Sequence, residues 1–141
     1  MNIRLTIMTK ELARQYFQGF VVDPALFMDN QEYKPYIYKE EQADDIVDRY
    51  RQMGRIYLAV MYHDEPIGEI VFKNIERQSK HCTLGISLQS DKFKNKGLGT
   101  KAEIMAIHSH ISDATRATGV FWIRRSSNNL IFMPIISYSY S

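Results

Sequence analysis

Residues 94–100 of this 141-residue chain read Lys94-Asn95-Lys96-Gly97-Leu98-Gly99-Thr100. The stretch follows an apolar run at about His81–Leu88 that predicts a strand, and it precedes a helical pattern that reaches about Ser112. Glycines let the backbone approach a ligand closely, and the unpaired N–H groups and dipole of a helix start favour an anion. The stretch therefore predicts a phosphate or pyrophosphate site. The alternative is an ordinary glycine turn beside a solvated lysine cluster.

Two familiar phosphate-binding loops do not fit this stretch. The nucleoside-triphosphatase loop requires Gly-Lys-Ser/Thr, whereas this chain has Gly99-Thr100-Lys101. Gly97-x-Gly99-x-x-Ala102 matches the loose dinucleotide pattern, but that pattern expects an acidic residue about twenty positions later. The chain has Gly119–Trp122 there. Neither nucleoside triphosphates nor dinucleotides are indicated.

The rest of the chain predicts a strand, two helices and three strands before the loop, and a helix and a further strand after it. The expected strands are Asn2–Ile7, Arg55–Tyr62, Ile67–Phe72, His81–Leu88 and Gly119–Arg125, and the expected helices are one capped by Thr9, one at about Glu40–Met53 and one after the loop. The residues expected to form the apolar faces of the three helices are Leu12, Tyr16, Phe17 and Phe20, then Ile46, Val47, Tyr50 and Met53, then Ile104, Ile107, His108 and Ile111. Asp44, Asp45 and Asp48 are expected to form a solvated face.

Composition limits the function classes. The length fits a single domain (residues 1–141), with a core at 1–112 and an atypical tail at 113–141. A net charge of +2 argues against a dedicated nucleic-acid or membrane-surface binder, and no apolar run approaches the length of a membrane helix. The single cysteine, Cys82, cannot form an internal disulfide and is expected to be a small core residue. These features favour the cytoplasm.

The motif order resembles the GNAT superfamily of acyl-CoA-dependent N-acyltransferases, particularly the branch related to ribosomal-protein N-terminal acetyltransferases. Lys94–Gly99 matches the family signature Gln/Arg-x-x-Gly-x-Gly/Ala apart from its first residue. The hairpin Ile56–Phe72 and the segment Leu84-Gly85-Ile86-Ser87 extend the resemblance. It implies an α+β fold with a mostly antiparallel central sheet flanked by helices, and a V-shaped splay after the fourth strand.

The resemblance also implies where acetyl-CoA binds. Backbone N–H groups across Lys94, Asn95, Lys96, Gly97, Leu98, Gly99 and Thr100 would hold the CoA pyrophosphate. Main-chain groups of Ser87 and Leu88 would pair with the pantetheine arm, and a bulge at that point would separate this strand from the next. The acceptor pocket is expected from residues 21–53, where Tyr33, Tyr36 and Tyr38 suggest an aromatic wall.

The catalytic groups depart from the family pattern. Many relatives place a Glu on the fourth strand, where this chain has Thr83, so Glu69 on the neighbouring strand is the substitute candidate for the proton acceptor. The alternative for Glu69 is a solvent-facing strand residue. The four histidines, His63, His81, His108 and His110, favour packing or surface roles, and no spacing predicts a metal site.

The C-terminal tail differs most from the family. Its last 28 residues contain no acidic residue, and the family's helix with a thiolate-protonating Tyr has no counterpart. The composition suggests a chain that is truncated or read in another frame, or a β-hairpin or irregular tail that replaces the helix. In a hairpin, Gly119–Arg125 would pair with Leu130–Tyr138, Asn128 or Asn129 would imitate the family Asn, and Tyr138 or Tyr140 would stand in for the acid.

The sequence thus predicts an acetyl-CoA-dependent N-acetyltransferase. Its acceptor would be a primary amine, namely a peptide N-terminus, a polyamine or a small metabolite. The alternatives are a catalytically inactive acyl-CoA-binding or interaction module and, with less support from the charge, an RNA- or ribosome-associated protein. The apolar C-terminal strand suggests a homodimer.

Overall fold

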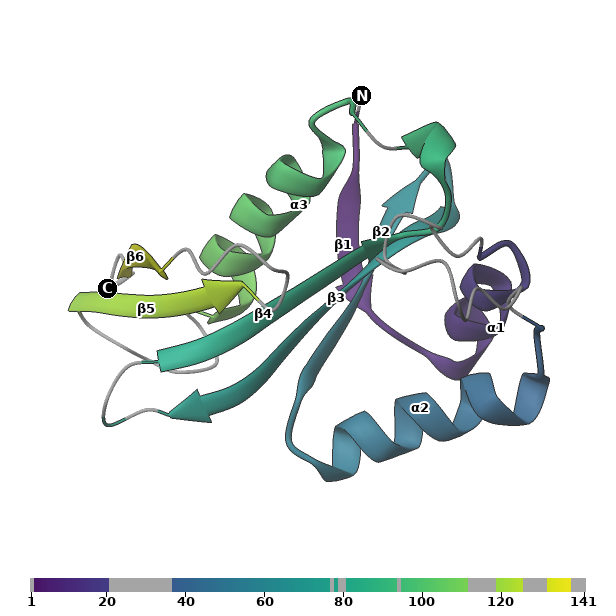
Figure 1. Ribbon diagram of the computed structural model, residues 1–141, viewed down its shortest axis with the longest axis horizontal. Helices are drawn as coiled ribbons and strands as arrows, with labels where there is room; N and C mark the ends of the chain where they lie inside the picture. The colour runs from purple at the N-terminus through teal and green to yellow at the C-terminus, as the bar shows by residue number, and fades with distance from the viewer. Residues whose placement is uncertain are drawn as a thin grey trace, which may run out of the picture.

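A six-stranded sheet forms the centre of the computed structural model, in the order β1-β2-β3-β4-β5-β6 (Figure 1). The structure describes residues 2–20, 37–76, 78, 81–93, 95–111, 119–125 and 132–137. The strands are β1 (Arg4–Ile7), β2 (Ile56–Tyr62), β3 (Glu65–Glu76), β4 (His81–Leu88), β5 (Gly119–Arg125) and β6 (Phe132–Ser137). Every neighbouring pair is antiparallel except β4 and β5, which are parallel. This confirms the predicted α+β class and the mostly antiparallel sheet.

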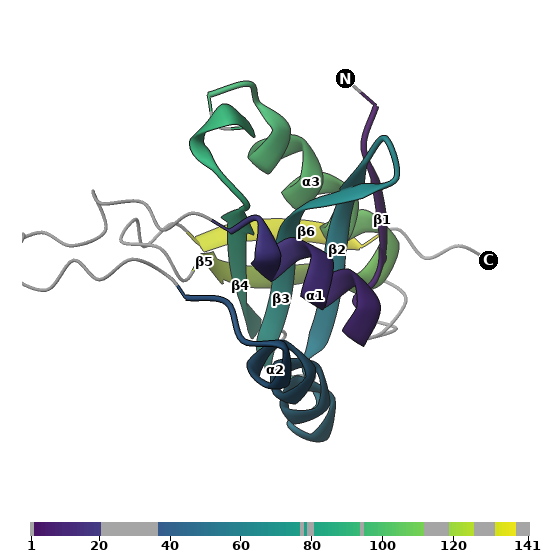
Figure 2. The same ribbon diagram turned by 90° about the vertical axis from the view of Figure 1, so that its right-hand side faces the viewer.

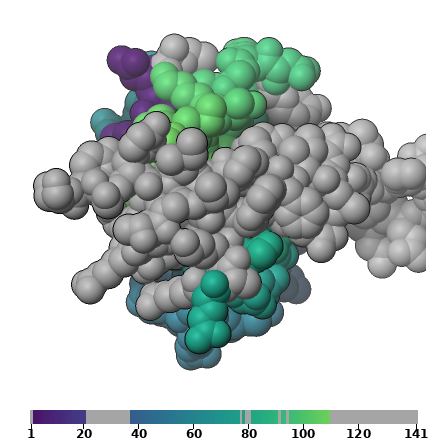
Figure 3. All heavy atoms as spheres, turned by 90° about the vertical axis from the view of Figure 1, so that its left-hand side faces the viewer, coloured from purple at the N-terminus to yellow at the C-terminus, as the bar shows by residue number. Residues whose placement is uncertain are grey.

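Helices cover both faces of the sheet. Helix α3 (Leu98–Ala106), which continues into the π-helical turn η3 (Ile107–Ile111), lies on one face, and α1 (Lys10–Gln18) and α2 (Glu40–Gln52) lie on the other (Figures 1 and 2). Figure 3 shows the green atoms of α3 and the blue atoms near α2 at opposite ends of the molecule. Strand alternation explains the two layers, because Leu58 and Val60 of β2 pack in the α3 cluster while Tyr57, Ala59 and Met61 pack in the α1–α2 cluster.

Helix α1 begins and packs as its sequence predicts. The Thr9 hydroxyl accepts a hydrogen bond from the Leu12 N–H at 3.2 Å, which caps the helix. Ala13 and Tyr16 are fully buried, and the Phe17 ring meets the Tyr16 ring edge-on at 5.0 Å. The predicted apolar stripe is therefore the buried face of α1.

The acidic face of α2 is more than a solvated surface. Asp44 forms two 2.7 Å hydrogen bonds with the Arg14 guanidinium of α1, and Asp48 pairs with Lys10 at 3.0 Å. The hydrogen bonds from Arg14 hold the pKa of Asp44 below its ordinary value. The predicted solvated face is therefore also an ion-paired face, because α1 brings two cations to the same side.

Helix α2 ends in a Schellman motif that leads into β2. Gly54 has a φ of +71°, its N–H donates to the Arg51 carbonyl at 3.1 Å, and the Arg55 N–H donates to the Tyr50 carbonyl at 3.0 Å. Met53 was predicted on the buried face, but its side chain is 58% exposed because the chain has already left the helix there. The motif determines where Arg55 lies.

The hairpin of β2 and β3 turns at two residues. His63 and Asp64 both have positive φ, 49° and 62°, which is the type I′ arrangement that matches strand twist. Tyr62 pairs with Glu65 across the turn. The predicted hairpin is confirmed, and its second strand extends well beyond the predicted Ile67–Phe72.

The buried face of α3 differs from the predicted stripe. Leu98, Ala102, Ala106 and Ile107 are buried in the core, whereas Ile104 is 48% exposed and His108 is exposed. The predicted stripe is therefore displaced by about one residue from the helix face that packs against the sheet. The side chain of Ile111 lies outside the described residues.

The two strands of the C-terminal region form a hairpin in the described backbone. Strands β5 and β6 pair from Gly119↔Ser137 to Arg124↔Phe132, and β6 is the outer strand of the sheet. Pro134 lies opposite Trp122 in β6. A proline is tolerated there because an edge strand has one unpaired side. The predicted hairpin is confirmed, while Asn128, Asn129, Tyr138 and Tyr140 lie outside the described residues.

Candidate functional site

The sheet opens where β4 runs past β5. Their parallel pairing extends from His81↔Trp122 to Leu84↔Arg125 and then ends, so Gly85–Leu88 continues along β3 alone among the described strands. The register with β3 is unbroken from Leu88 to Thr83, so the bulge expected at Ser87 and Leu88 is not seen in that pairing. The splay comes from the end of the β4–β5 pairing, and it leaves backbone groups of β4 available to a ligand.

Close approach of the backbone positions this end of β4. Gly68 of β3 lies opposite Leu88, and a Cβ at Gly68 would come within 3.0 Å of the Ser87 carbonyl oxygen. The Gln89 N–H donates to the Ile67 carbonyl at 2.7 Å, and the Gln89 amide donates to the Tyr16 carbonyl of α1 at 2.9 Å. Strand β4 is therefore tied to both β3 and α1 just before the glycine loop.

The glycine loop, residues 94–100, leads from β4 to α3. The short helical turn η2 (Asp91–Phe93) anchors it through the buried Phe93, and Leu98 buries its side chain at the start of α3. Asn95 and Gly97 both adopt the left-handed conformation, with φ of 60° and 72°. Lys94 lies outside the described residues. The two buried side chains fix the loop ends while its backbone faces outward.

The start of α3 presents backbone donors that the helix itself does not use. Gly97 is the N-cap and has no side chain to fill the cap, so the N–H groups of Leu98, Gly99 and Thr100 have no partner within the helix. A Cβ at Gly99 would meet no atom closer than the Ile86 Cδ1 at 3.8 Å. Asn95, Lys96 and Gly97 are exposed. These donors, the open space and the nearby Lys96 charge fit a phosphate or pyrophosphate group.

A pocket of about 180 Å³ lies on the opposite, α2 side of the sheet. We call it the β3–β4 pocket; its lining residues are Tyr50, Arg55, Glu69, Val71, Lys73, Gly85, Ile86 and Ser87. Glu69 lies directly opposite Ser87, and Val71 lies opposite Gly85, so the pocket follows one face of the two strands. The structure thus brings together two predicted site residues, Glu69 and Ser87.

Glu69 is held by a hydrogen bond from Tyr57. The Tyr57 hydroxyl donates to the Glu69 Oε2, and the Tyr57 ring contacts the Tyr50 ring at 4.9 Å in an edge-on arrangement. Burial raises the pKa of Glu69, although the bond from Tyr57 opposes the shift, and burial also raises the pKa of Tyr57. Glu69 is a partly buried, oriented carboxyl group rather than a solvent-facing strand residue. A raised pKa makes its carboxylate a better proton acceptor.

Two lining residues of the pocket, Arg55 and Lys73, and the hydrogen-bond donor to Glu69, Tyr57, were not singled out from the sequence. Tyr57 reaches Glu69 diagonally across β2 and β3, Arg55 places its guanidinium carbon 4.7 Å from the Tyr50 ring centre, and Lys73 lies at the far end of the pocket. Alternation along β2 and β3 could have placed Tyr57 and Glu69 on one face. Nothing in the sequence indicated the position of Arg55, which depends on the Schellman motif.

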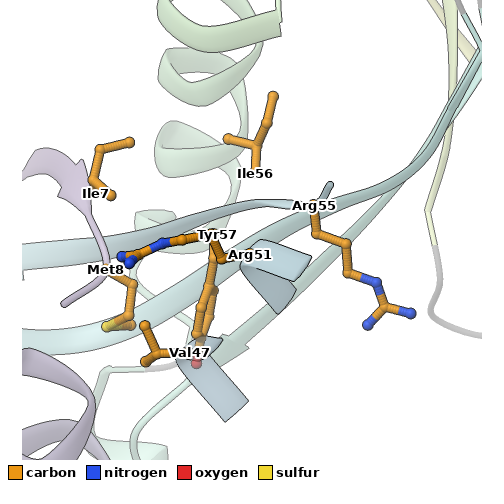
Figure 4. A pocket seen from close by; sticks show the side chains of 7 residues that line it. All are labelled: Ile7, Met8, Val47, Arg51, Arg55, Ile56 and Tyr57. Atoms are coloured by element: carbon orange, nitrogen blue, oxygen red, sulfur yellow. The ribbon is translucent and has the colours of Figure 1, made fainter. Parts of the chain in front are cut away.

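A second pocket, of about 190 Å³, lies on the other side of Arg55. Figure 4 shows its lining residues, Ile7, Met8, Val47, Arg51, Arg55, Ile56 and Tyr57. The Arg51 side chain extends toward Met8, whereas the Arg55 side chain extends away from Ile7, Met8 and Val47. Arg55 lines both pockets, but its side chain extends away from the second one, so we assign it to the β3–β4 pocket. Arg51 lines the second pocket alone.

The remaining candidate groups lie elsewhere. Cys82 is buried in the α3 cluster, where burial raises the pKa of its thiol to about 12, which confirms a core role. His63 is in the hairpin turn, and His81 and His108 are exposed. The side chain of His110 is outside the described residues, as are Tyr33 and Tyr36. Within the described ranges, no three His, Cys, Asp or Glu side chains cluster as metal ligands, and no helix is long and apolar enough to cross a membrane.

Comparison with known proteins identifies a family. Residues 2–130 match the family model described as "Acetyltransferase (GNAT) domain". No curated protein sequence matches the chain significantly.

Solved structures share the fold at low sequence identity. A protein from T. thermophilus, described as an acetyltransferase, superposes with a TM-score of 0.64 at 17% identity, covering 92% of this chain and 66% of its own. The microcin C7 self-immunity acetyltransferase MccE, in complex with acetyl-CoA and AMP, gives 0.63 at 16% identity, covering 90% of this chain and 71% of its own. AAC(6')-Ib, in complex with ribostamycin and coenzyme A, gives 0.64 at 14% identity, covering 92% and 77%. The chain thus spans just under two thirds of the T. thermophilus protein.

Proposed function

Because the chain belongs to the GNAT acetyltransferase family, we propose that it transfers an acetyl group from acetyl-CoA to a primary amine. The observation that carries the proposal is the combination at the end of β4: the strand loses its β5 partner at Leu84 and leads into a glycine-capped helix start. MccE and AAC(6')-Ib, which share the fold, are solved with acetyl-CoA and coenzyme A respectively.

The glycine loop is proposed to bind the CoA pyrophosphate. Backbone N–H groups from Asn95 to Thr100 would donate to its oxygens, with Lys94 and Lys96 adding positive charge. Main-chain groups of Ser87 and Leu88 would pair with the pantetheine arm, because this part of β4 has no β5 neighbour among the described residues. Acetyl-CoA supplies an acetyl group activated as a thioester.

Glu69 is proposed as the proton acceptor. The attacking amine must lose a proton, and a carboxylate of raised pKa beside Ser87 is placed to accept it, directly or through one water. Tyr57 orients the carboxylate by its hydrogen bond. Thr83, at the position where many relatives carry a Glu, lies opposite Lys73 at the far end of the pocket.

Two measurements test the proposal. Saturating acetyl-CoA should raise the unfolding temperature, since a ligand at 100 times its dissociation constant stabilises by about 2.7 kcal/mol. Release of free CoA thiol, followed with a panel of primary amines, should then show amine-dependent turnover. Binding without turnover on any amine would instead support the catalytically inactive acyl-CoA-binding module, and no binding would refute the site assignment.

Three finer features belong to the same proposal. The likeness to the ribosomal-protein N-acetyltransferase branch rests on the hairpin and loop sequences, and the single cysteine favours a reducing compartment such as the cytoplasm. The outer edge of β6 offers unpaired backbone groups for a homodimer. Light scattering at several concentrations would test the dimer, and a monomer throughout would refute it.

A further inference from the structure

The charges of the β3–β4 pocket are arranged in order along its length. Glu69 and Ser87 lie at one end, and Lys73 lies four residues from Glu69 along β3, a separation of roughly 13 Å between their Cα atoms. Arg55 precedes Ile56, which pairs with Phe72, so Arg55 lies beside Lys73 across the two strands. The pocket therefore has a carboxyl end and a cationic end.

The two cations have no carboxylate partner among the described residues. The described ion pairs use Arg4, Lys10, Arg14 and Arg49 as their cations. Arg55 instead makes a cation–π contact with the Tyr50 ring. Glu69, the one acidic residue that lines the pocket, already accepts a hydrogen bond from Tyr57. Both cations are partly buried, so solvent screens them less than fully exposed lysines and arginines.

A ligand that carries both an amine and an anionic group would therefore place them at opposite ends of this pocket. Under the proposed function, the amine to be acetylated lies near Glu69 and Ser87, within the splayed part of β4. An anionic group on the same molecule would meet Arg55 and Lys73, and charge-assisted hydrogen bonds there would favour its binding. A second amine at that end would face two like charges.

We propose that the acceptor is a primary amine whose molecule carries a carboxylate or phosphate several bonds from the nitrogen, with Arg55 and Lys73 recognising the anion. This inference rests on the proposed function and narrows its acceptor class. It excludes polyamines as preferred acceptors. It also separates this chain from AAC(6')-Ib, which is solved with ribostamycin, an aminoglycoside.

Linear amines of similar length test the charge preference. The probes are 6-aminohexanoate, hexylamine and hexane-1,6-diamine, with 5-aminopentyl phosphate to distinguish a carboxylate from a phosphate. We expect kcat/KM to be at least about tenfold higher for one of the anionic amines than for hexylamine, and lowest for the diamine. Equal values, or a preference for the diamine, would overturn the inference. Whichever anionic amine is preferred identifies the anion.

A binding measurement keeps the test independent of turnover. The acetylated products 6-acetamidohexanoate, N-hexylacetamide and N-acetylhexane-1,6-diamine are titrated by calorimetry into the protein, with and without CoA. We expect the anionic product to bind about tenfold more tightly than the neutral one. Failure of acetyl-CoA to bind refutes the proposed function, whereas charge-independent binding of these products refutes only the inference.

Three variants test whether Arg55 and Lys73 cause the preference for anionic acceptors. Arg55→Gln and Lys73→Gln should each reduce the anionic-to-neutral ratio by about three- to tenfold, and Arg55→Lys should retain most of it. Arg51→Gln is the matched control, since it removes the same charge one helical turn away but lines the second pocket. Lys73 lies on a strand and makes no described ion pair, so Lys73→Gln keeps the test valid if Arg55→Gln fails to fold. An unchanged ratio in both Gln variants would overturn the assignment.

Discussion

The glycine loop and the β3–β4 pocket lie near the same end of β4 but are built differently. The loop is seven consecutive residues, and its chemistry comes from backbone N–H groups and from the conformation of Gly97. The pocket collects side chains from α2, the turn before β2, β3 and β4. The comparison shows that a backbone site can be recognised in a short sequence, whereas a side-chain site depends on how distant segments pair.

Glu69→Gln should separate the roles of the two regions most clearly, because it alters the pocket and leaves the loop unchanged. We expect kcat to fall by about 10²–10⁴-fold, because the amide cannot accept the amine's proton, while the acetyl-CoA dissociation constant is unchanged. In the unaltered protein, kcat/KM should rise with pH as Glu69 loses its proton at its raised pKa. Steady-state kinetics and calorimetry measure both. The matched control is Glu65→Gln, an exposed position on the same strand; a similar fall there would contradict the role of Glu69.

The reciprocal change is Gly99→Val in the loop. The branched side chain occupies the open space at the start of α3, so the thermal stabilisation by acetyl-CoA should disappear, a loss of up to about 2.7 kcal/mol at 100 times the original dissociation constant. Gly99→Ala should lose less of it. Thermal unfolding with and without acetyl-CoA measures the effect, and undiminished stabilisation in Gly99→Val would remove the loop from the binding site.

A smaller effect is expected from Gly54→Ala at the end of α2. A Cβ there meets no atom within 4 Å, but the φ of +71° is strained for alanine, so the free energy of unfolding should fall by about 1 kcal/mol. Because Gly54 positions Arg55, the anion preference should weaken while acetyl-CoA binding stays the same. Urea unfolding provides the measurement. Loss of acetyl-CoA binding would show that the two regions are coupled.

The smallest effect concerns the pH dependence of stability, since Glu69 is only partly buried. The pKa of Glu69 is raised in the folded state. Its stabilising contribution to the free energy of unfolding is therefore fully present below the ordinary Glu pKa of 4.5, and it is lost as pH rises through the folded-state pKa. The free energy of unfolding of the wild type should therefore fall relative to Glu69→Gln over that range. Parallel urea titrations from pH 4 upward measure it, and a constant difference would contradict the raised pKa.

Most of the fold could be predicted from local patterns. The strand at His81–Leu88, the cap at Thr9 and the hairpin turn at His63 and Asp64 follow from alternation, capping and turn chemistry within a few residues. The bulge expected at Ser87 and Leu88 is absent from the β3–β4 pairing, and Met53 lies beyond the end of α2. The wrong predictions at Ile104 and His108 concern which side of a helix meets a neighbour. That outcome depends on the partner element, which the helix sequence alone does not specify.

The sequence by itself determined the glycine loop, the order of strands and helices along the chain and the family, because these rest on residue types at fixed short spacings. Only the tertiary structure decided that Tyr57 holds Glu69, that Arg55 and Lys73 line one pocket, and that α1 supplies cations to the acidic residues of α2. Side-chain contacts across strands and helices depend on register and on how each element ends. The register of β2, β3 and β4 and the Schellman motif at Gly54 therefore set the geometry of the pocket.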